Sequence, residues 1–138
     1  APHGDTIDFL TISTFGDSTD FGNLTQDRRS GGAMGSSETR GLFAGGQHPS
    51  PFTFFNIIDF VTIASTGNAQ DFGDMVMTYS ARSSCASQTR AVFMGALDAY
   101  SDCDFVTIST TGNAIDFGNL ALGSGYNQGF SNSHGGLM

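Results

Sequence analysis

Short runs of alternating apolar and polar residues follow one another along this chain, and none has the 3.6-residue period of an amphipathic helix. The segment from Asp59 to Ile63 alternates as a half-buried strand does, except that Phe60 and Val61 are adjacent apolar residues. This adjacent pair indicates burial on both faces near the start of the strand. No apolar run approaches the roughly 18 residues of a membrane-spanning helix. The pattern therefore predicts an all-β protein that does not insert into a membrane.

The same strand pattern occurs three times. Each copy has an Asp-Phe pair and, 12 residues later, a second Asp-Phe pair that is followed by glycine. The first pairs begin at Asp8, Asp59 and Asp104, and the second pairs begin at Asp20, Asp71 and Asp116. A period of about 46 residues is typical of repeat proteins, in which each unit buries its apolar face against the next unit. We expect one all-β domain over residues 1–138, with repeats at approximately 5–56, 57–102 and 103–138.

Each repeat is expected to contain about four strands. Between the two Asp-Phe pairs, Thr-Gly-Asn at 66–68 and 111–113, and Phe-Gly-Asp at 15–17, are expected to supply the positive-φ residues of a hairpin turn. The glycine after each second Asp-Phe pair indicates a β-bulge or a close approach of another backbone. These glycines are Gly22, Gly73 and Gly118.

A strand of small residues is expected next, at 31–37, 83–87 and 128–132, because small side chains suit the crowded centre of a radial architecture. A hydrophobic strand follows it. This strand begins near Arg40 and Arg90 in the first two copies, and the chain ends inside a third such block at 133–138. We expect Arg40 and Arg90 to pair with a repeated aspartate at a junction between repeats, or to bind sugar hydroxyls or a carboxylate in a shared pocket.

The connection from the hydrophobic strand to the next Asp-Phe strand varies between copies. This connection comprises residues 47–56 in one copy and residues 97–102 in the next. Variable loops on a repeated scaffold commonly carry binding residues. The candidate ligand-binding residues of these loops are His48, Phe52, Phe54, Phe55 and Tyr100. We expect their rings to pack under the loops, to form a subunit contact, or to stack on glycan rings.

The amino-acid composition argues against several classes of function. The formal net charge is −8 and the chain contains no lysine, which argues against nucleic-acid binding, a basic membrane-binding patch and Schiff-base chemistry. Cys85 and Cys103 are too few for a disulfide framework, and the residues leave open whether they are two thiols or one bridge.

No catalytic arrangement is expected. The three Asp-Phe-Gly motifs resemble a kinase magnesium motif, but neither a lysine nor a glycine-rich phosphate loop accompanies them. We therefore expect each aspartate to cap a turn and each phenylalanine to fill the core. The three histidines are spread over different repeats, and no Gly-x-Ser-x-Gly elbow is present. These features predict a protein that is not an enzyme, with no metal site and no cofactor.

Two resemblances extend these expectations. The order of strands, together with Phe43-Ala-Gly-Gly46 and the arginines Arg28, Arg29 and Arg82 after the last strand, resembles a kelch-type β-propeller blade, although phenylalanine stands where kelch repeats have tryptophan. The segment from Ile58 to Met75 resembles, almost throughout, a repeated unit in virion proteins of bacteriophages that infect aquatic bacteria. The second resemblance covers nearly the whole chain and implies a tail-fibre-like or other structural protein of the particle.

Three blades do not close a propeller, which typically has four to eight. We therefore expect half of a six-bladed, kelch-like β-propeller that a second chain completes; the alternative is a single-chain β-trefoil or β-prism. The expected function is a non-enzymatic structural and adhesion module on the virion or otherwise outside the cell. Its expected partners are further copies of itself, other virion proteins and a host surface glycan. The alternative function is a free lectin with one sugar site per repeat.

Overall fold

The computed structural model describes residues 4–29, 33–48, 53–78 and 80–131. These residues form ten β-strands and no helix, so the all-β prediction is confirmed. The strands are β1 (Gly4–Phe9), β2 (Thr19–Arg28), β3 (Ala33–Ser36), β4 (Arg40–Ala44), β5 (Ile57–Thr62), β6 (Gln70–Asp74), β7 (Ser83–Ala86), β8 (Arg90–Ala96), β9 (Tyr100–Thr107) and β10 (Ile115–Asn119). Within the described part of the chain, no helix is long and apolar enough to cross a membrane.

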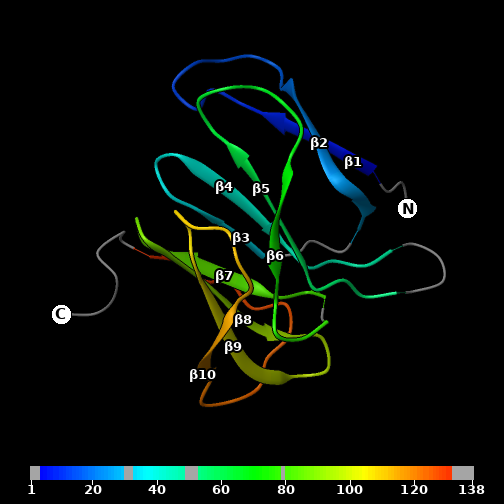
Figure 1. The fold of residues 1–138 in the computed structure, drawn as a ribbon, viewed down its shortest axis with the longest axis vertical. Coiled ribbons are helices and arrows are strands. Elements are labelled where there is room, and N and C mark those ends of the chain that lie inside the picture. Colours follow the sequence, from blue (N-terminus) through cyan, green and yellow to red (C-terminus); the bar gives the residue numbers. More distant parts are fainter. Residues whose placement is uncertain (1–3, 30–32, 49–52, 79, 132–138) are drawn as a thin grey trace.

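The strands form three antiparallel sheets (Figure 1). β1 and β2 form a two-stranded sheet, β3 to β6 form a second sheet in chain order, and β7 to β10 form a third sheet with the same order. Each four-stranded sheet begins with the small-residue strand and ends with the strand that carries Asp-Phe-Gly, as the sequence predicts. The sheets run over 33–74 and 83–119, so each crosses one of the expected repeat limits.

The glycine of each Asp-Phe-Gly motif lies at a β-bulge. Gly22, Gly73 and Gly118 have positive φ angles of 149°, 143° and 128°, and the strand register shifts beside each of them. A Cβ atom added to Gly73 would lie 2.5 Å from the carbonyl oxygen of Gly112, and one added to Gly22 would clash with the carbonyl of Gly67. The expected bulge and the expected close backbone approach therefore occur together.

The positive φ angles predicted for the Gly-Asn segments occur at Gly67 and Gly112, with values of 157° and 156°, but the predicted position of the hairpin turns is wrong. The reverse turns come earlier in each hairpin and are closed by the N–H of Ser65 donating to Thr62 O at 3.3 Å and of Thr110 donating to Thr107 O at 3.2 Å. Asn68 and Asn113 do not have positive φ angles. The Gly-Asn residues instead run along the neighbouring sheet, and this explains why they recur.

We call residues 67–69 and 112–114 the capping segments, because each covers the edge strand of the preceding sheet. Gly67 N–H donates to Phe21 O at 2.7 Å, and Ala69 N–H donates to Asn23 O at 2.8 Å. The Asn68 side chain completes the set by accepting from Asn23 N–H at 3.1 Å. Since an uncovered strand edge leaves unpaired backbone groups, these bonds satisfy the edge of β2.

The second capping segment repeats this pattern on β6. Gly112 N–H donates to Phe72 O at 2.8 Å, Ala114 N–H donates to Asp74 O at 2.7 Å, and Asp74 N–H donates to the Asn113 side chain at 3.0 Å. The same three hydrogen bonds therefore join the first sheet to the second and the second sheet to the third.

The main core lies between the two four-stranded sheets. Phe60 and Phe72 meet edge to face, with ring centroids 5.9 Å apart, and pack in one buried cluster with Val106 and Ile108 of the next sheet. This buried cluster is completed by Ala33, Leu42, Ala44, Ile58, Met75, Ala91 and Phe93. A smaller cluster of Ile7, Val61 and Ala69 lies between the first two sheets. As expected, Phe72 of the second Asp-Phe-Gly motif fills the core, but the same expectation is wrong for Phe117 of the third motif, which is 55% exposed.

The third small-residue strand is not formed in the described part of its range, because residues 128–131 have no strand structure. β3 and β7 are each held by one neighbour, β4 and β8. The corresponding neighbour of 128–131 is the expected strand at 133–138, which lies outside the described residues, as does residue 132.

We expect Gly73→Ala to destabilise the fold more than Gly118→Ala. Both substitutions place a side chain at a positive φ, but only the first also places a Cβ against another backbone, because no described atom lies within 4 Å of the Cβ position at Gly118. The difference should be about 1–3 kcal/mol, as for overpacking. Urea unfolding of both variants at one low protein concentration measures it, and equal losses would contradict the role of the capping segments.

Candidate functional site

Two buried arginine–aspartate pairs link consecutive parts of the fold. Arg28, at the end of β2, contacts Asp59 on β5 through its guanidinium and also donates to Gly45 O at 2.8 Å. Arg82, between β6 and β7, donates to Asp104 at 2.6 Å. The Arg82 and Asp104 side chains are only 1% and 2% exposed.

Backbone carbonyls complete both arginine sites. Arg82 donates to Gly95 O, Phe93 O and Asp102 O at 2.9, 3.1 and 3.0 Å. Burial lowers the pKa of the Arg28 guanidinium from its usual value, and the Asp59 carboxylate acts in the opposite direction. The carboxylate and the carbonyls thus offset the cost of removing these charges from water.

The expected ion pairs of Arg40 and Arg90 are therefore wrong, because Arg28 and Arg82 take the repeated aspartates. Arg40 instead lies over the Phe60 ring, 4.6 Å from its centroid, and donates to Ile108 O of the next sheet at 2.9 Å. Arg90 lies in the same way over Phe105, at 4.8 Å. Both arginines cover an aromatic ring of their own sheet.

The candidate loop residues are only partly brought together. His48 and Phe55 meet edge to face with ring centroids 6.2 Å apart, and the loop is closed by His48 N–H donating to Thr53 O at 2.8 Å. Phe54 is 37% exposed, and Tyr100 begins β9 and is 43% exposed. Phe52 lies outside the described residues.

The predicted site residues lie at opposite ends of the sheets. Arg40 and Arg90 begin β4 and β8, opposite Thr62 and Thr107 at the ends of β5 and β9. The loop with His48 leaves the other end of β4, and Tyr100 pairs with Ala96 at the other end of β8. The arginines and the aromatic loops therefore do not form one pocket.

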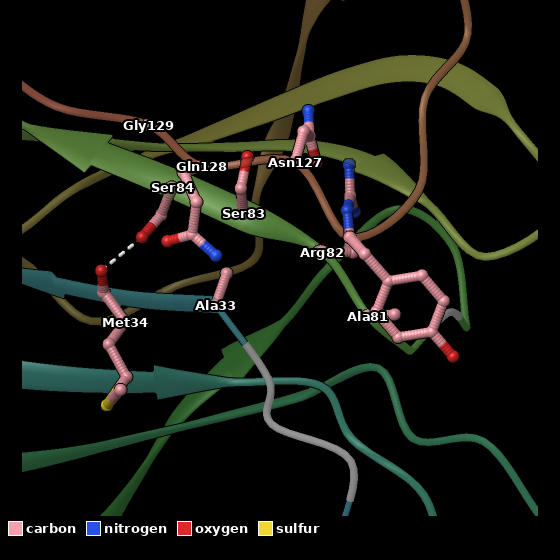
Figure 2. Close-up of a pocket in the computed structure, with 10 residues that line it drawn as sticks. Ala33, Met34, Ala81, Arg82, Ser83, Ser84, Asn127, Gln128 and Gly129 are labelled. Atoms are coloured by element: carbon pink, nitrogen blue, oxygen red, sulfur yellow. Dashed lines mark hydrogen bonds between the residues drawn. The ribbon is translucent and has the colours of Figure 1, made fainter.

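A cavity of about 520 Å³ lies where β3 and β7 begin. Its walls come from the start of β3, from the residues around the start of β7, and from the segment after β10 (Figure 2). The lining residues are Ala33, Met34, Ala81, Arg82, Ser83, Ser84, Tyr126, Asn127, Gln128 and Gly129. The Ser84 hydroxyl donates to Met34 O across this gap.

Two polar atoms of this cavity have no hydrogen-bond partner among the described residues. They are Ser83 Oγ and Asn127 Oδ1, and both are buried. Tyr126, which also lines the cavity, is 74% exposed. Buried polar atoms are normally paired, so these two atoms are an exception in this fold.

The sequence interpretation missed this cavity. The small-residue pattern predicts only a strand at Ser83, and Tyr126 and Asn127 belong to none of the recurring motifs. The only available signal was the Tyr-Asn-Gln triplet after the last Asp-Phe-Gly strand, where an aromatic ring stands beside two amides.

Cys85 and Cys103 are free thiols. They lie on β7 and β9, which are separated by β8, so they are not on neighbouring strands. Burial raises the pKa of the Cys103 thiol.

No group of three or more histidine, cysteine, aspartate or glutamate side chains that could hold a metal ion occurs in the part of the chain that the structure describes. No family model and no curated protein sequence matches this chain.

We expect Arg82→Met to cost about 3–5 kcal/mol of unfolding free energy, because it leaves the Asp104 carboxylate buried without its partner. The double variant Arg82→Met/Asp104→Leu should recover part of this loss by removing the unpaired charge. Arg90→Met is the matched control and should cost about 1 kcal/mol or less, since it removes only an exposed contact with a ring. Urea unfolding at pH 7 measures all three. A loss for Arg82→Met no larger than for Arg90→Met would contradict the role given to the buried pair.

We expect iodoacetamide to modify Cys85 faster than Cys103 in the folded protein at pH 8. Cys103 is 4% exposed and its raised pKa leaves less of the reactive thiolate at this pH, whereas Cys85 is half-buried. Peptide mass spectrometry over time measures both rates, and in urea the two rates should converge. Equal rates in the folded protein would be evidence against this difference in environment.

Proposed function

We propose that this chain is a non-enzymatic structural and adhesion module of a bacteriophage particle. In this role it is displayed on the virion surface and binds a host surface glycan, with a neighbouring virion protein as a further partner. The observation that carries the proposal is the polar cavity at the start of β3 and β7, in which Ser83 Oγ and Asn127 Oδ1 lack partners among the described residues.

The chemistry of the cavity suits a sugar. A sugar offers several hydroxyl groups that both donate and accept hydrogen bonds, and the cavity is lined by the hydroxyl-bearing residues Ser83, Ser84 and Tyr126 and by the amide-bearing residues Asn127 and Gln128. Tyr126 supplies an exposed ring at the same place, on which the apolar face of a sugar can rest.

The arrangement of the sheets supports a display role. The capping segments and the pair of Arg28 with Asp59 hold consecutive sheets together, so the loops at the end of the sheets opposite Arg40 and Arg90 are presented by a rigid scaffold. Phe54 and Tyr100 are exposed at this loop end. The segment after β10 lies against the same end, where Ser124 N–H donates to Tyr100 O at 3.3 Å.

We further propose that the chain is half of a six-bladed, kelch-like β-propeller that a second copy completes. Two four-stranded sheets with the same strand order pack against each other through a shared core, as blades do. Separate four-stranded sheets, each with its strands in chain order, favour this architecture over the β-trefoil.

The test is binding of the purified protein to an array of bacterial envelope glycans. We expect Tyr126→Ser and Ser83→Ala to weaken binding, the first by about tenfold or more, as for an aromatic hot spot. Phe130→Ser is the matched control, because Phe130 is 96% exposed and does not line the cavity. Absence of binding to any glycan would refute the glycan-binding part of the proposal.

Mass spectrometry of purified particles tests the other part. The chain should be present in stoichiometric amounts in particles that have been washed in high salt. A chain that binds glycans but is absent from particles would instead be the free lectin.

A further inference from the structure

Within the chain, each contact between sheets pairs an edge strand with a capping segment. At each end of the row of sheets, one of these two parts is present without the other. At one end, β10 is an edge strand, and no capping segment among the described residues covers it. At the other end, residues 16–18 occupy the position of a capping segment, eight to ten residues after Asp8, as 67–69 follow Asp59. No described atom lies within 4 Å of the Cβ position at Gly118, whereas the equivalent positions at Gly22 and Gly73 lie against the backbone of a capping segment.

We propose that a second copy of this chain docks head to tail, with its residues 10–18 on β10 and on the Phe105–Phe117 pair of the first copy. This inference deepens the two-chain architecture proposed above by naming the surface that joins the copies. It does not depend on the adhesion role.

The hydrogen bonds between sheets within one chain predict the hydrogen bonds between two docked copies. By equivalence with Gly67 and Ala69, the N–H groups of Gly16 and Ser18 would donate to Phe117 O and Asn119 O. Asn119 N–H would donate to the Asp17 side chain, because Asp17 stands where Asn68 and Asn113 stand and also offers an acceptor oxygen. Gly118 keeps the space that a neighbouring backbone requires.

The apolar surfaces match in the same way. In the internal joint, Val106 and Ile108 cover the edge-to-face pair of Phe60 and Phe72. The equivalent pair, Phe105 and Phe117, has the same centroid distance of 5.9 Å, but Phe117 is 55% exposed whereas Phe72 is 2% exposed.

The apolar residues that would cover this pair are exposed at the opposite end of the chain. Leu10 and Ile12 are equivalent to Val106 and Ile108, and they are 62% and 100% exposed. Ile12, Ile63 and Ile108 share one repeat position, and their exposure falls from 100% to 46% to 0% along the row of sheets. Burial of this position therefore increases with the amount of preceding sheet, and a second copy supplies the sheet that Ile12 lacks.

Arg90 provides a third matching feature. Arg40 lies over Phe60 and donates to Ile108 O of the next sheet, whereas the guanidinium of Arg90 lies over Phe105 and makes no hydrogen bond to any described residue. The acceptor that the repeat assigns to Arg90 is the carbonyl of Ile12 in the docked copy.

One internal feature has no equivalent at the new joint. Arg28 and Arg82 neutralise Asp59 and Asp104, but the chain has no arginine after Arg90, so Asp8 of the docked copy would lack such a partner. An unpaired carboxylate at a joint is costly, so the association should be weaker than the internal joints and concentration-dependent. Because the two docking surfaces differ, the contact produces a closed ring or an open filament.

Sedimentation velocity from about 1 µM to about 1 mM tests the proposal, since this range covers weak and moderate Kd values. The wild-type chain should associate reversibly. Ile12→Asp should abolish association, whereas Phe130→Asp, which places the same charge at another fully exposed apolar position, should not. Asp8→Asn should strengthen association by removing the unpaired carboxylate.

Arg90→Ala should weaken association about tenfold, as for a lost charged hydrogen bond, with unchanged circular dichroism. Gly118→Ala should weaken it further because its Cβ meets the docked backbone. The proposal would be overturned by a monomer throughout this concentration range, or by equal effects of Ile12→Asp and Phe130→Asp. Glycan binding that persists in a monomeric Ile12→Asp variant would leave the proposed adhesion role intact, so the two failures can be told apart.

Discussion

The fold depends on the covering of strand edges. Each sheet ends in a strand whose outer N–H and C=O groups need partners, and in β2 and β6 these partners come from a short segment of the following sheet. The covering segment uses two backbone N–H groups and one asparagine side chain at each joint. Because it approaches so closely, the covered strand must have glycine at its bulge, and this single steric requirement explains the recurrence of Asp-Phe-Gly better than any catalytic role does.

The buried arginine–aspartate pairs contribute to the fold in a different way from the capping segments. The buried pairs of Arg28 with Asp59 and of Arg82 with Asp104 contribute little net stability over apolar packing, because desolvation offsets much of the attraction between the charges. Their effect is on geometry: a guanidinium that must reach one carboxylate and two or three carbonyls fits only one placement of the neighbouring strands. The chain thus combines non-directional burial of phenylalanine and isoleucine with directional contacts that fix the register of the sheets.

Local signals in the sequence were sufficient for the fold class and for the strand order within a repeat. Alternation predicted the strands, and Gly73 in a returning strand predicted the bulge, because both depend on the residue itself. The partners across the joints were not predictable in this way. A Gly-Asn pair suits a hairpin turn as well as a capping segment, and two sets of recurring arginines compete for Asp104. Arg82 follows Asp71 at a different spacing from that of Arg28 after Asp20, so the repeat did not single out the correct set. The cavity residues Tyr126 and Asn127 belong to none of the recurring motifs, and only the path of the chain brings them to Ser83.

The division of each sheet into two ends has a functional consequence. Residues in and beside the capping segments are constrained in two ways, because each must fit its own sheet and also the adjacent sheet. A substitution there therefore affects the stability of both sheets. At the loop end, the β4–β5 connection and the β8–β9 connection differ in length and sequence although the sheets that bear them are alike. Different recognition residues can therefore be carried by the same scaffold. The polar cavity combines both properties, because its lining includes Arg82, which the fold requires, and Tyr126, which is exposed and lies after the last strand.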